Sequence, residues 1–139
     1  MSSITIRVAL VGVGGVCAQV HYPGFSRIPG VEIVGICDPD ASLREQRSRE
    51  WGVEACFDDV DDLLREIKPD AVVIATPNCT HKSLILTAFA AGSHVLCEKP
   101  LGMNLQETKE ILEAAQKTKR RHMTAFTYRF VPAMNYLRY

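Results

Sequence analysis

Residues 4–17, Ile-Thr-Ile-Arg-Val-Ala-Leu-Val-Gly-Val-Gly-Gly-Val-Cys, decide the fold of this chain. Residues 4–11 form a short apolar run, which predicts a strand buried on both faces. The glycines that follow open a predicted helix that runs to about Tyr22. In that context glycines turn the chain sharply and let backbone N–H groups approach a pyrophosphate. We therefore expect the turn to bind a dinucleotide through Gly12, Val13, Gly14, Gly15 and Val16.

This motif departs from the dinucleotide-binding fingerprint at its last position, where Cys17 stands in place of a third glycine. A cysteine is small enough to let a helix pack closely on a strand, although it can also push the two slightly apart. Taken alone, the motif fits a plain glycine-rich turn equally well. The choice between the two interpretations depends on the rest of the chain.

Apolar runs and segments of helical spacing alternate along the whole sequence. We expect further strands at 31–37, 53–57, 71–75, 93–97 and 123–128, and helices at 40–51, 60–67, 78–91 and 104–121. Each connection is long enough for a crossover, which predicts parallel neighbours. The fold class is therefore α/β, with a doubly wound parallel sheet in the strand order 3-2-1-4-5-6. A ligand would lie over the carboxyl ends of the strands, between the first and the fourth.

The composition is that of one ordinary globular domain. Of the 139 residues 47% are hydrophobic, and 16 Lys and Arg balance 16 Asp and Glu. Zero net charge argues against a nucleic-acid partner and leaves self-association into a homo-oligomer open. No uninterrupted apolar run is long enough for a membrane helix, and residues 8–16 are too rich in glycine for a signal peptide, so we expect no membrane partner and a cytoplasmic location. The five cysteines have no metal-ligand spacing; we expect reduced, mostly buried thiols and no metal.

Asp38 ends the second predicted strand and strengthens the dinucleotide interpretation. A carboxylate there accepts hydrogen bonds from the adenosine ribose hydroxyls and repels a 2′-phosphate, so NAD is favoured over NADP. Arg44 is the candidate to hold a 2′-phosphate, but we interpret it as a solvated helix residue, and Asp40 as the cap of that helix. A doubly wound domain that binds S-adenosylmethionine also has a glycine-rich turn and an acidic residue here, so it stays as an alternative.

Two further loops end the fourth and fifth predicted strands. Thr76, Pro77 and Asn78 offer polar groups to a ligand beside the switch point, although a turn with Asn78 or Thr80 capping the next helix is the simpler interpretation. His81, in the first turn of that helix, either faces the pocket or has a structural role.

Glu98, Lys99 and Pro100 follow the fifth predicted strand. Beside a bound nicotinamide, Lys99 is a candidate catalytic residue that exchanges a proton with a substrate hydroxyl, its pKa lowered by partial burial or a neighbouring cation. Glu98 is a candidate to orient the lysine or the nicotinamide ribose. The alternative is an ordinary solvated pair of charges.

The segments GVGGVCAQVHYPGF, ICDPD, DAVVIATPNCTH, AAGSHVLCEKPLG and FTYRFVPA resemble, in order and spacing, the N-terminal half of the Gfo/Idh/MocA family, the glucose-fructose oxidoreductase and inositol dehydrogenase group. The resemblance implies an NAD(P)-binding Rossmann domain of a dehydrogenase acting by hydride transfer on a sugar, polyol or related hydroxy compound. It also implies that Lys99 is the active-site lysine, and that Glu98 and residues 76–78 line the nicotinamide side.

The length departs from the resemblance, since family members carry a second, substrate-binding domain. We expect residues 1–128 to be the dinucleotide-binding domain and residues 129–139 to begin the connection to a missing second domain, which makes this a truncated chain that is inactive alone. The alternative from another class is a non-catalytic NAD(P)-binding sensor or interaction module; retention of Lys99 argues mildly against it.

Overall fold

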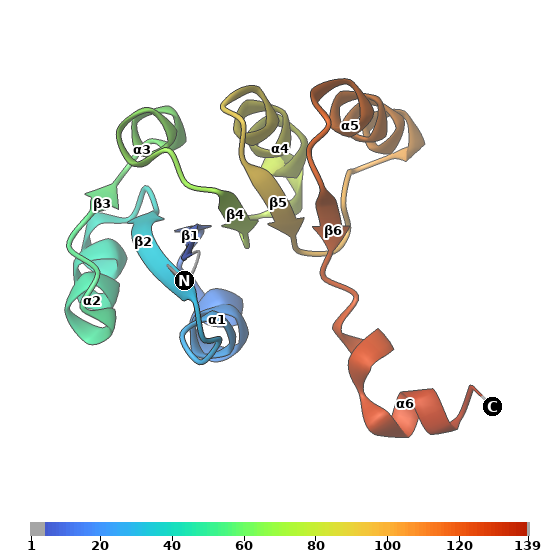
Figure 1. Cartoon of the computed structure of the whole chain (residues 1–139), viewed down its shortest axis with the longest axis horizontal. Helices are drawn as coiled ribbons and strands as arrows, with labels where there is room; N and C mark the ends of the chain where they lie inside the picture. The colour runs from blue at the N-terminus through green and yellow to red at the C-terminus, as the bar shows by residue number, and fades with distance from the viewer. Residues whose placement is uncertain (1–4, 139) are drawn as a thin grey trace.

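The computed structural model describes residues 5–138 and contains one six-stranded parallel sheet in the order β3-β2-β1-β4-β5-β6 (Figure 1). The predicted fold class and strand order are confirmed. The strands are β1 (Ile6–Val11), β2 (Val31–Cys37), β3 (Cys56–Phe57), β4 (Ala71–Ile74), β5 (His94–Cys97) and β6 (His122–Thr124). Every pair of neighbouring strands is parallel, so all carboxyl ends meet at one edge of the sheet.

Helices cover both faces of the sheet. One face carries a π-helical turn and two α-helices, and the other carries three crossover helices (Figure 1). The first group is η1 (Cys17–His21), α1 (Tyr22–Phe25) and α2 (Ala41–Trp51), and the second is α3 (Val60–Ile67), α4 (His81–Ala90) and α5 (Leu105–Thr118). Two short 3-10 turns, η2 (Asn78–Thr80) and η3 (Thr127–Phe130), and a last helix, α6 (Pro132–Tyr136), complete the chain.

Side-chain caps start α2, α3 and α5, and the cap of α3 is Asp59. Asp40 accepts the backbone N–H of Leu43 at 3.0 Å at the start of α2, which confirms the predicted cap. Asn104 does the same for Glu107 at 2.9 Å at the start of α5. These oxygens satisfy N–H groups that have no partner within the helix.

Two apolar clusters, one on each face of the sheet, form the core. Successive side chains of a strand point to opposite faces of the sheet, so β1, β2 and β4 each contribute residues to both clusters. On one face Val11, Val72 and Ile74 pack against α3, α4 and α5, and on the other Leu10 and Ile36 pack against η1 and α2.

The structure differs from the sequence-based bounds at several ends. The sixth strand covers residues 122–124 instead of 123–128, because the chain leaves the sheet after Ala125 and turns into η3. The predicted helix 78–91 is a 3-10 turn followed by α4, and the predicted strand 53–57 shortens to two residues. The predicted strand residue Ile4 lies outside the described residues.

The C-terminal segment 126–138 lies apart from the sheet (Figure 1). Its large apolar side chains are exposed, with Tyr128 at 75% and Tyr136 at 84%. Among the helices of residues 5–138, none combines the length and the apolar character that crossing a membrane requires.

Candidate functional site

The glycine turn packs directly on the end of β4. Gly12 has φ +81°, and its N–H donates to the carbonyl oxygen of Cys37 at 2.8 Å. A Cβ at this position would lie 2.7 Å from the carbonyl oxygen of Ala75, which is closer than real Cβ contacts come. Only glycine fits this close approach and this backbone conformation.

The next residues begin the helix that a pyrophosphate would face. Val13 is buried in the core, whereas Gly15 and Val16 are exposed. A Cβ on Gly14 or Gly15 would meet no atom within 4 Å, so open space lies beside this part of the backbone. The first N–H groups of a helix have no partner within the helix and favour an anion. Gly14, Gly15 and Val16 are therefore positioned to present N–H groups to phosphate oxygens.

Asp38 and the glycine turn are joined by a direct hydrogen bond. Asp38 Oδ2 accepts the N–H of Val13 at 2.9 Å, and Oδ1 accepts the N–H of Asp40 at 3.0 Å. These hydrogen bonds fix the carboxylate at the end of β2, beside the glycine turn with which it was predicted to form one site. Val13 contributes its N–H to Asp38, which leaves its neighbours to face a phosphate.

Two arginines of α2 lie closer to this site than a solvated helix residue would. Arg44 Nη1 donates to the carbonyl oxygen of Asp38, and Arg47 Nε donates to that of Val13 at 3.2 Å. Arg47 also lies 5.6 Å from the ring centroid of Trp51 and pairs with Glu50. Arg44, which we interpreted as a solvated helix residue, is partly exposed and hydrogen-bonded to the backbone of the site.

A cavity of about 690 Å³ opens over the carboxyl ends of β1, β2 and β4. Predicted site residues line this cavity. The sequence did not predict two other parts of the lining, the acidic rim formed by Asp58, Asp59 and Asp61 and the side of α4 that carries Ser83, Leu84 and Thr87. Its lining includes Gly12, Gly14, Asp38, Thr76, Pro77, Asp58, Asp59, Asp61, Ser83, Leu84 and Thr87. Within the described part of the chain, this lining contains no lysine or arginine and does not reach Glu98 or Lys99.

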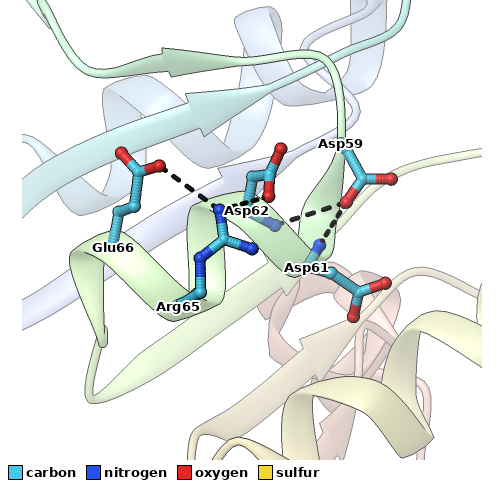
Figure 2. Close-up of polar contacts among 5 residues, drawn as sticks. All are labelled: Asp59, Asp61, Asp62, Arg65 and Glu66. Carbon is cyan, nitrogen blue, oxygen red and sulfur yellow. Dashed lines mark hydrogen bonds and ion pairs between the residues drawn. The ribbon is translucent and has the colours of Figure 1, made fainter.

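The acidic rim is organised by the cap of α3. Asp59 Oδ1 accepts the N–H of Asp61 at 2.8 Å and that of Asp62 at 3.3 Å, and Arg65 lies between Asp62 and Glu66 on the outer side (Figure 2). Two adjacent aspartates directly after a predicted strand were the signal available in the sequence.

The loop after β4 is ordered by its own side chains. Thr80 Oγ1 lies 2.7 Å from Thr76 Oγ1, while Pro77 and Asn78 are exposed at the edge of the sheet. Neither Asn78 nor Thr80 caps a helix through its side chain. The simpler interpretation, in which the side chain of Asn78 or Thr80 caps the next helix, is therefore wrong.

His81 does not face the cavity. The ring is fully buried, with Nδ1 2.8 Å from the carbonyl oxygen of Pro100 and Nε2 2.9 Å from that of Thr76. Both ring nitrogens face backbone oxygens, so the ring does not make the predicted direct contact with a cofactor. The structure supports the alternative structural role for His81.

Glu98 and Lys99 lie at the end of β5 with different surroundings. Lys99 is exposed, so the predicted partial burial of its side chain is not found among residues 5–138. Glu98 Oε1 lies 2.9 Å from Nε2 of His21, and Oε2 accepts the backbone N–H of Lys99 at 3.2 Å. His21 is a residue of the site region that sequence reasoning missed.

The cysteines are not part of a reactive or metal-binding cluster. Burial raises the pKa of Cys17, Cys37 and Cys97 to about 12, so these thiols stay protonated. All five cysteines are free, with Cys56 partly buried and Cys79 exposed. Residues 5–138 contain no group of three His, Cys, Asp or Glu side chains with the geometry for a metal ion.

A family profile and the sequences of individual proteins both match this chain and indicate the same family. The sequence profile of the Gfo/Idh/MocA oxidoreductases, described as an oxidoreductase family with an NAD-binding Rossmann fold, matches residues 6–126. The chain is 33% identical over 130 residues to D-glucoside 3-dehydrogenase of Escherichia coli, a match that covers 94% of this chain and 37% of that enzyme.

Solved structures agree with the sequence comparison. Apo scyllo-inositol dehydrogenase of Lactobacillus casei superposes with a TM-score of 0.90 at 26% identity, over 99% of this chain and 41% of that one. The same enzyme with bound NAD(H) and scyllo-inositol gives 0.88 at 26% identity, over 96% and 39%. The chain thus spans about two fifths of the length of these relatives.

Proposed function

Since this chain belongs to the Gfo/Idh/MocA oxidoreductase family, which has an NAD-binding Rossmann fold, we propose that it binds NAD(H) across the carboxyl ends of its strands. The adenosine half occupies the cavity beside Asp38, and the pyrophosphate faces the N–H groups of Gly14, Gly15 and Val16. The nicotinamide half lies toward residues 76–78 and 98–100. A volume of about 690 Å³ is within the usual range for a small-molecule site.

One observation carries this proposal: Asp38 is hydrogen-bonded at 2.9 Å to Val13 of the glycine turn. Two groups that are far apart in the sequence are thereby fixed in one site, in the arrangement that ribose and pyrophosphate recognition requires. Neither the glycines nor the aspartate alone would distinguish a binding site from an ordinary turn.

NAD is the preferred cofactor in this proposal. Asp38, Asp58, Asp59 and Asp61 line the cavity, and their negative charges oppose the extra phosphate of NADP. Arg44 is the positive charge that would favour a 2′-phosphate, because its guanidinium lies beside Asp38 and donates to the Asp38 carbonyl oxygen. Arg47 also lies near the site but is hydrogen-bonded to Val13 and paired with Glu50. Four carboxylates against two arginines that are already hydrogen-bonded favour the cofactor without the 2′-phosphate.

Lys99 is the proposed catalytic residue. The nicotinamide ring, when bound, exchanges a hydride with the carbinol carbon of the substrate. Lys99 exchanges the proton of the same carbinol, accepting the hydroxyl proton during oxidation and returning it during reduction. The exposed position of Lys99 at the sheet edge leaves this amine free to reach a substrate.

The substrate class and the remainder of the enzyme follow from the relatives. We propose a sugar, polyol or related hydroxy compound, with residues 1–128 as the dinucleotide-binding domain and residues 129–139 as the start of a connection to a substrate-binding domain. The chain alone then binds cofactor but turns over little substrate. Five free cysteines suit a reducing compartment, so we propose the cytoplasm.

Calorimetric titration of the folded chain with NADH and, separately, NADPH tests the cofactor proposal. We expect saturable binding that is tighter for NADH. S-adenosylmethionine is the matched negative ligand, since it shares the adenosine but lacks the pyrophosphate. Tighter binding of S-adenosylmethionine, or no binding of either dinucleotide, would contradict the proposal.

The role of Lys99 is tested after a relative's substrate-binding domain has been joined to this chain. Lys99→Ala is expected to abolish dehydrogenase activity and leave NADH affinity unchanged. Lys82→Ala is a matched control, because Lys82 is paired with Glu110 on α4 and α5, away from the proposed chemistry. Equal activity in Lys99→Ala and the parent would remove Lys99 from catalysis, and NADH binding with no activity in either would favour the non-catalytic module.

A further inference from the structure

The loop that carries Lys99 is contacted by two buried histidines from different parts of the chain. His21 lies at the end of η1, after the glycine turn, and His81 begins α4, after the Thr76 loop. Both rings are at most 5% exposed. Neither histidine belongs to the two apolar clusters of the core, so their polar contacts require an explanation.

His21 reaches the loop through Glu98. Nε2 of His21 and Oε1 of Glu98 are 2.9 Å apart, and the Glu98 side chain is only 13% exposed. The other carboxylate oxygen of Glu98 accepts the backbone N–H of Lys99 at 3.2 Å. A chain of contacts therefore runs from the helix that follows the glycine turn to the backbone of Lys99.

His81 contacts the other side of the same loop. Its ring lies between the carbonyl oxygens of Thr76 and Pro100, at 2.9 and 2.8 Å. A carbonyl oxygen only accepts and a neutral imidazole carries one N–H, so the neutral His81 ring donates to one of these two oxygens and is in contact with the other without a hydrogen bond. Through this ring the residue after Lys99 is joined to the loop at the end of β4.

We propose that His21 and His81 are positioning residues that hold the Lys99 loop in place before the cofactor binds. The proposal rests on the proposed function for the identity of the reacting lysine. His21 sets the distance of Lys99 from the pyrophosphate side, and His81 sets its distance from the Thr76 loop. Burial strengthens these contacts, because little water competes for the polar atoms.

The first test uses the chain without cofactor. We expect His21→Leu and His81→Leu to lower the ¹⁵N order parameter of the Lys99 amide while the amides of β1 stay rigid. His21→Gln keeps a donor near the position of Nε2 and is expected to restore the order; His81→Asn is the milder variant if His81→Leu fails to fold. Ile111→Ala, in the buried face of α5, is the control for a general loss of stability. An unchanged Lys99 amide in the two leucine variants overturns the proposal.

The second test compares NADH with ADP-ribose, which lacks the nicotinamide. In His21→Leu we expect the NADH affinity to fall about fivefold relative to the ADP-ribose affinity, with Ile111→Ala leaving that ratio unchanged. Equal losses for both ligands overturn the positioning role. If the parent chain binds neither ligand, the cofactor proposal fails, and the order parameter of Lys99 still decides the role of the histidines.

Discussion

At the level of single residues, Asp38 combines a structural contact with a charge that we propose selects the cofactor. We predict that Asp38→Asn lowers the NADH-to-NADPH affinity ratio by about tenfold, which is 1.4 kcal/mol. The amide oxygen can still accept the N–H of Val13, although the amide NH₂ replaces the oxygen that accepts the N–H of Asp40, so the change removes the charge together with one local hydrogen bond. Asp40→Asn carries the same charge change two residues away and is expected to leave the ratio nearly unaltered. Calorimetry with both cofactors measures it, and equal shifts in the two variants would show a general electrostatic effect instead.

Gly12 and Gly14 differ in what a methyl group would meet. Gly12→Ala is predicted to lower the free energy of unfolding by about 2 kcal/mol or more, because it combines a positive φ with a clash against Ala75. Gly14→Ala has open space, so its Tm should match the parent, but the methyl group lines the cavity and should weaken NADH binding about tenfold. Thermal unfolding and titration separate the two. Parent-like affinity in a folded Gly14→Ala would move the pyrophosphate away from Gly14.

At the level of elements, α3 depends on one carboxylate at its start. Asp59→Ala removes the acceptor for the N–H groups of Asp61 and Asp62 (Figure 2) and is predicted to cost about 1 kcal/mol, or roughly 4 °C in Tm. Asp58→Ala removes the same charge from the neighbouring residue without removing the cap. Thermal unfolding should therefore separate the two variants, and equal shifts in Tm would attribute the effect to charge rather than capping.

The elements also show how far sequence patterns reach. Apolar runs and caps such as Asp40 predicted the helices and strands well, because burial and capping are local in the sequence. The sixth strand was predicted too long, because its neighbour β5 ends at Cys97, which pairs with Thr124, and no further strand residues remain to pair with residues 126–128. The ring of His81 points to Thr76 and Pro100, and that depends on how α4 packs, which a single histidine in a sequence does not reveal.

At the level of the whole molecule, the order of the strands could be predicted because crossover handedness and parallel pairing leave few topologies. The same rules placed residues 12–16, 38 and 76–78 at one edge. They could not predict the pairing of His21 with Glu98, because it joins side chains 77 positions apart. They also could not show that the cavity is acidic and ends before Lys99, since this depends on the positions of individual side chains.

Thiol reactivity reports whether the whole core is formed. We predict that an alkylating reagent modifies Cys79 first in the folded chain, while Cys17, Cys37 and Cys97 react only after unfolding. Raising the pH from about 8 to about 9 should not change that protection, because burial raises the pKa of these three thiols to about 12 and keeps them protonated. The unfolded state loses these protons at lower pH, so the three thiols favour unfolding as the pH rises above roughly 9. Mass spectrometry of the modified peptides checks the order, and early modification of Cys97 would contradict the packing of β5.

The exposed segment 126–138 should control how these molecules associate. Tyr128, Phe130, Tyr136 and Leu137 are each more than 60% exposed, and large apolar surfaces of this kind favour association. Zero net charge adds little repulsion between copies. We predict that the chain forms oligomers as its concentration rises, and that removing residues 127–139 gives a monomer with an unchanged Tm and NADH affinity. Arg129→Ala within the segment is the control for a loss of charge alone. Sedimentation equilibrium measures the association, and persistent oligomers after the deletion would place the contact on the sheet or its helices instead.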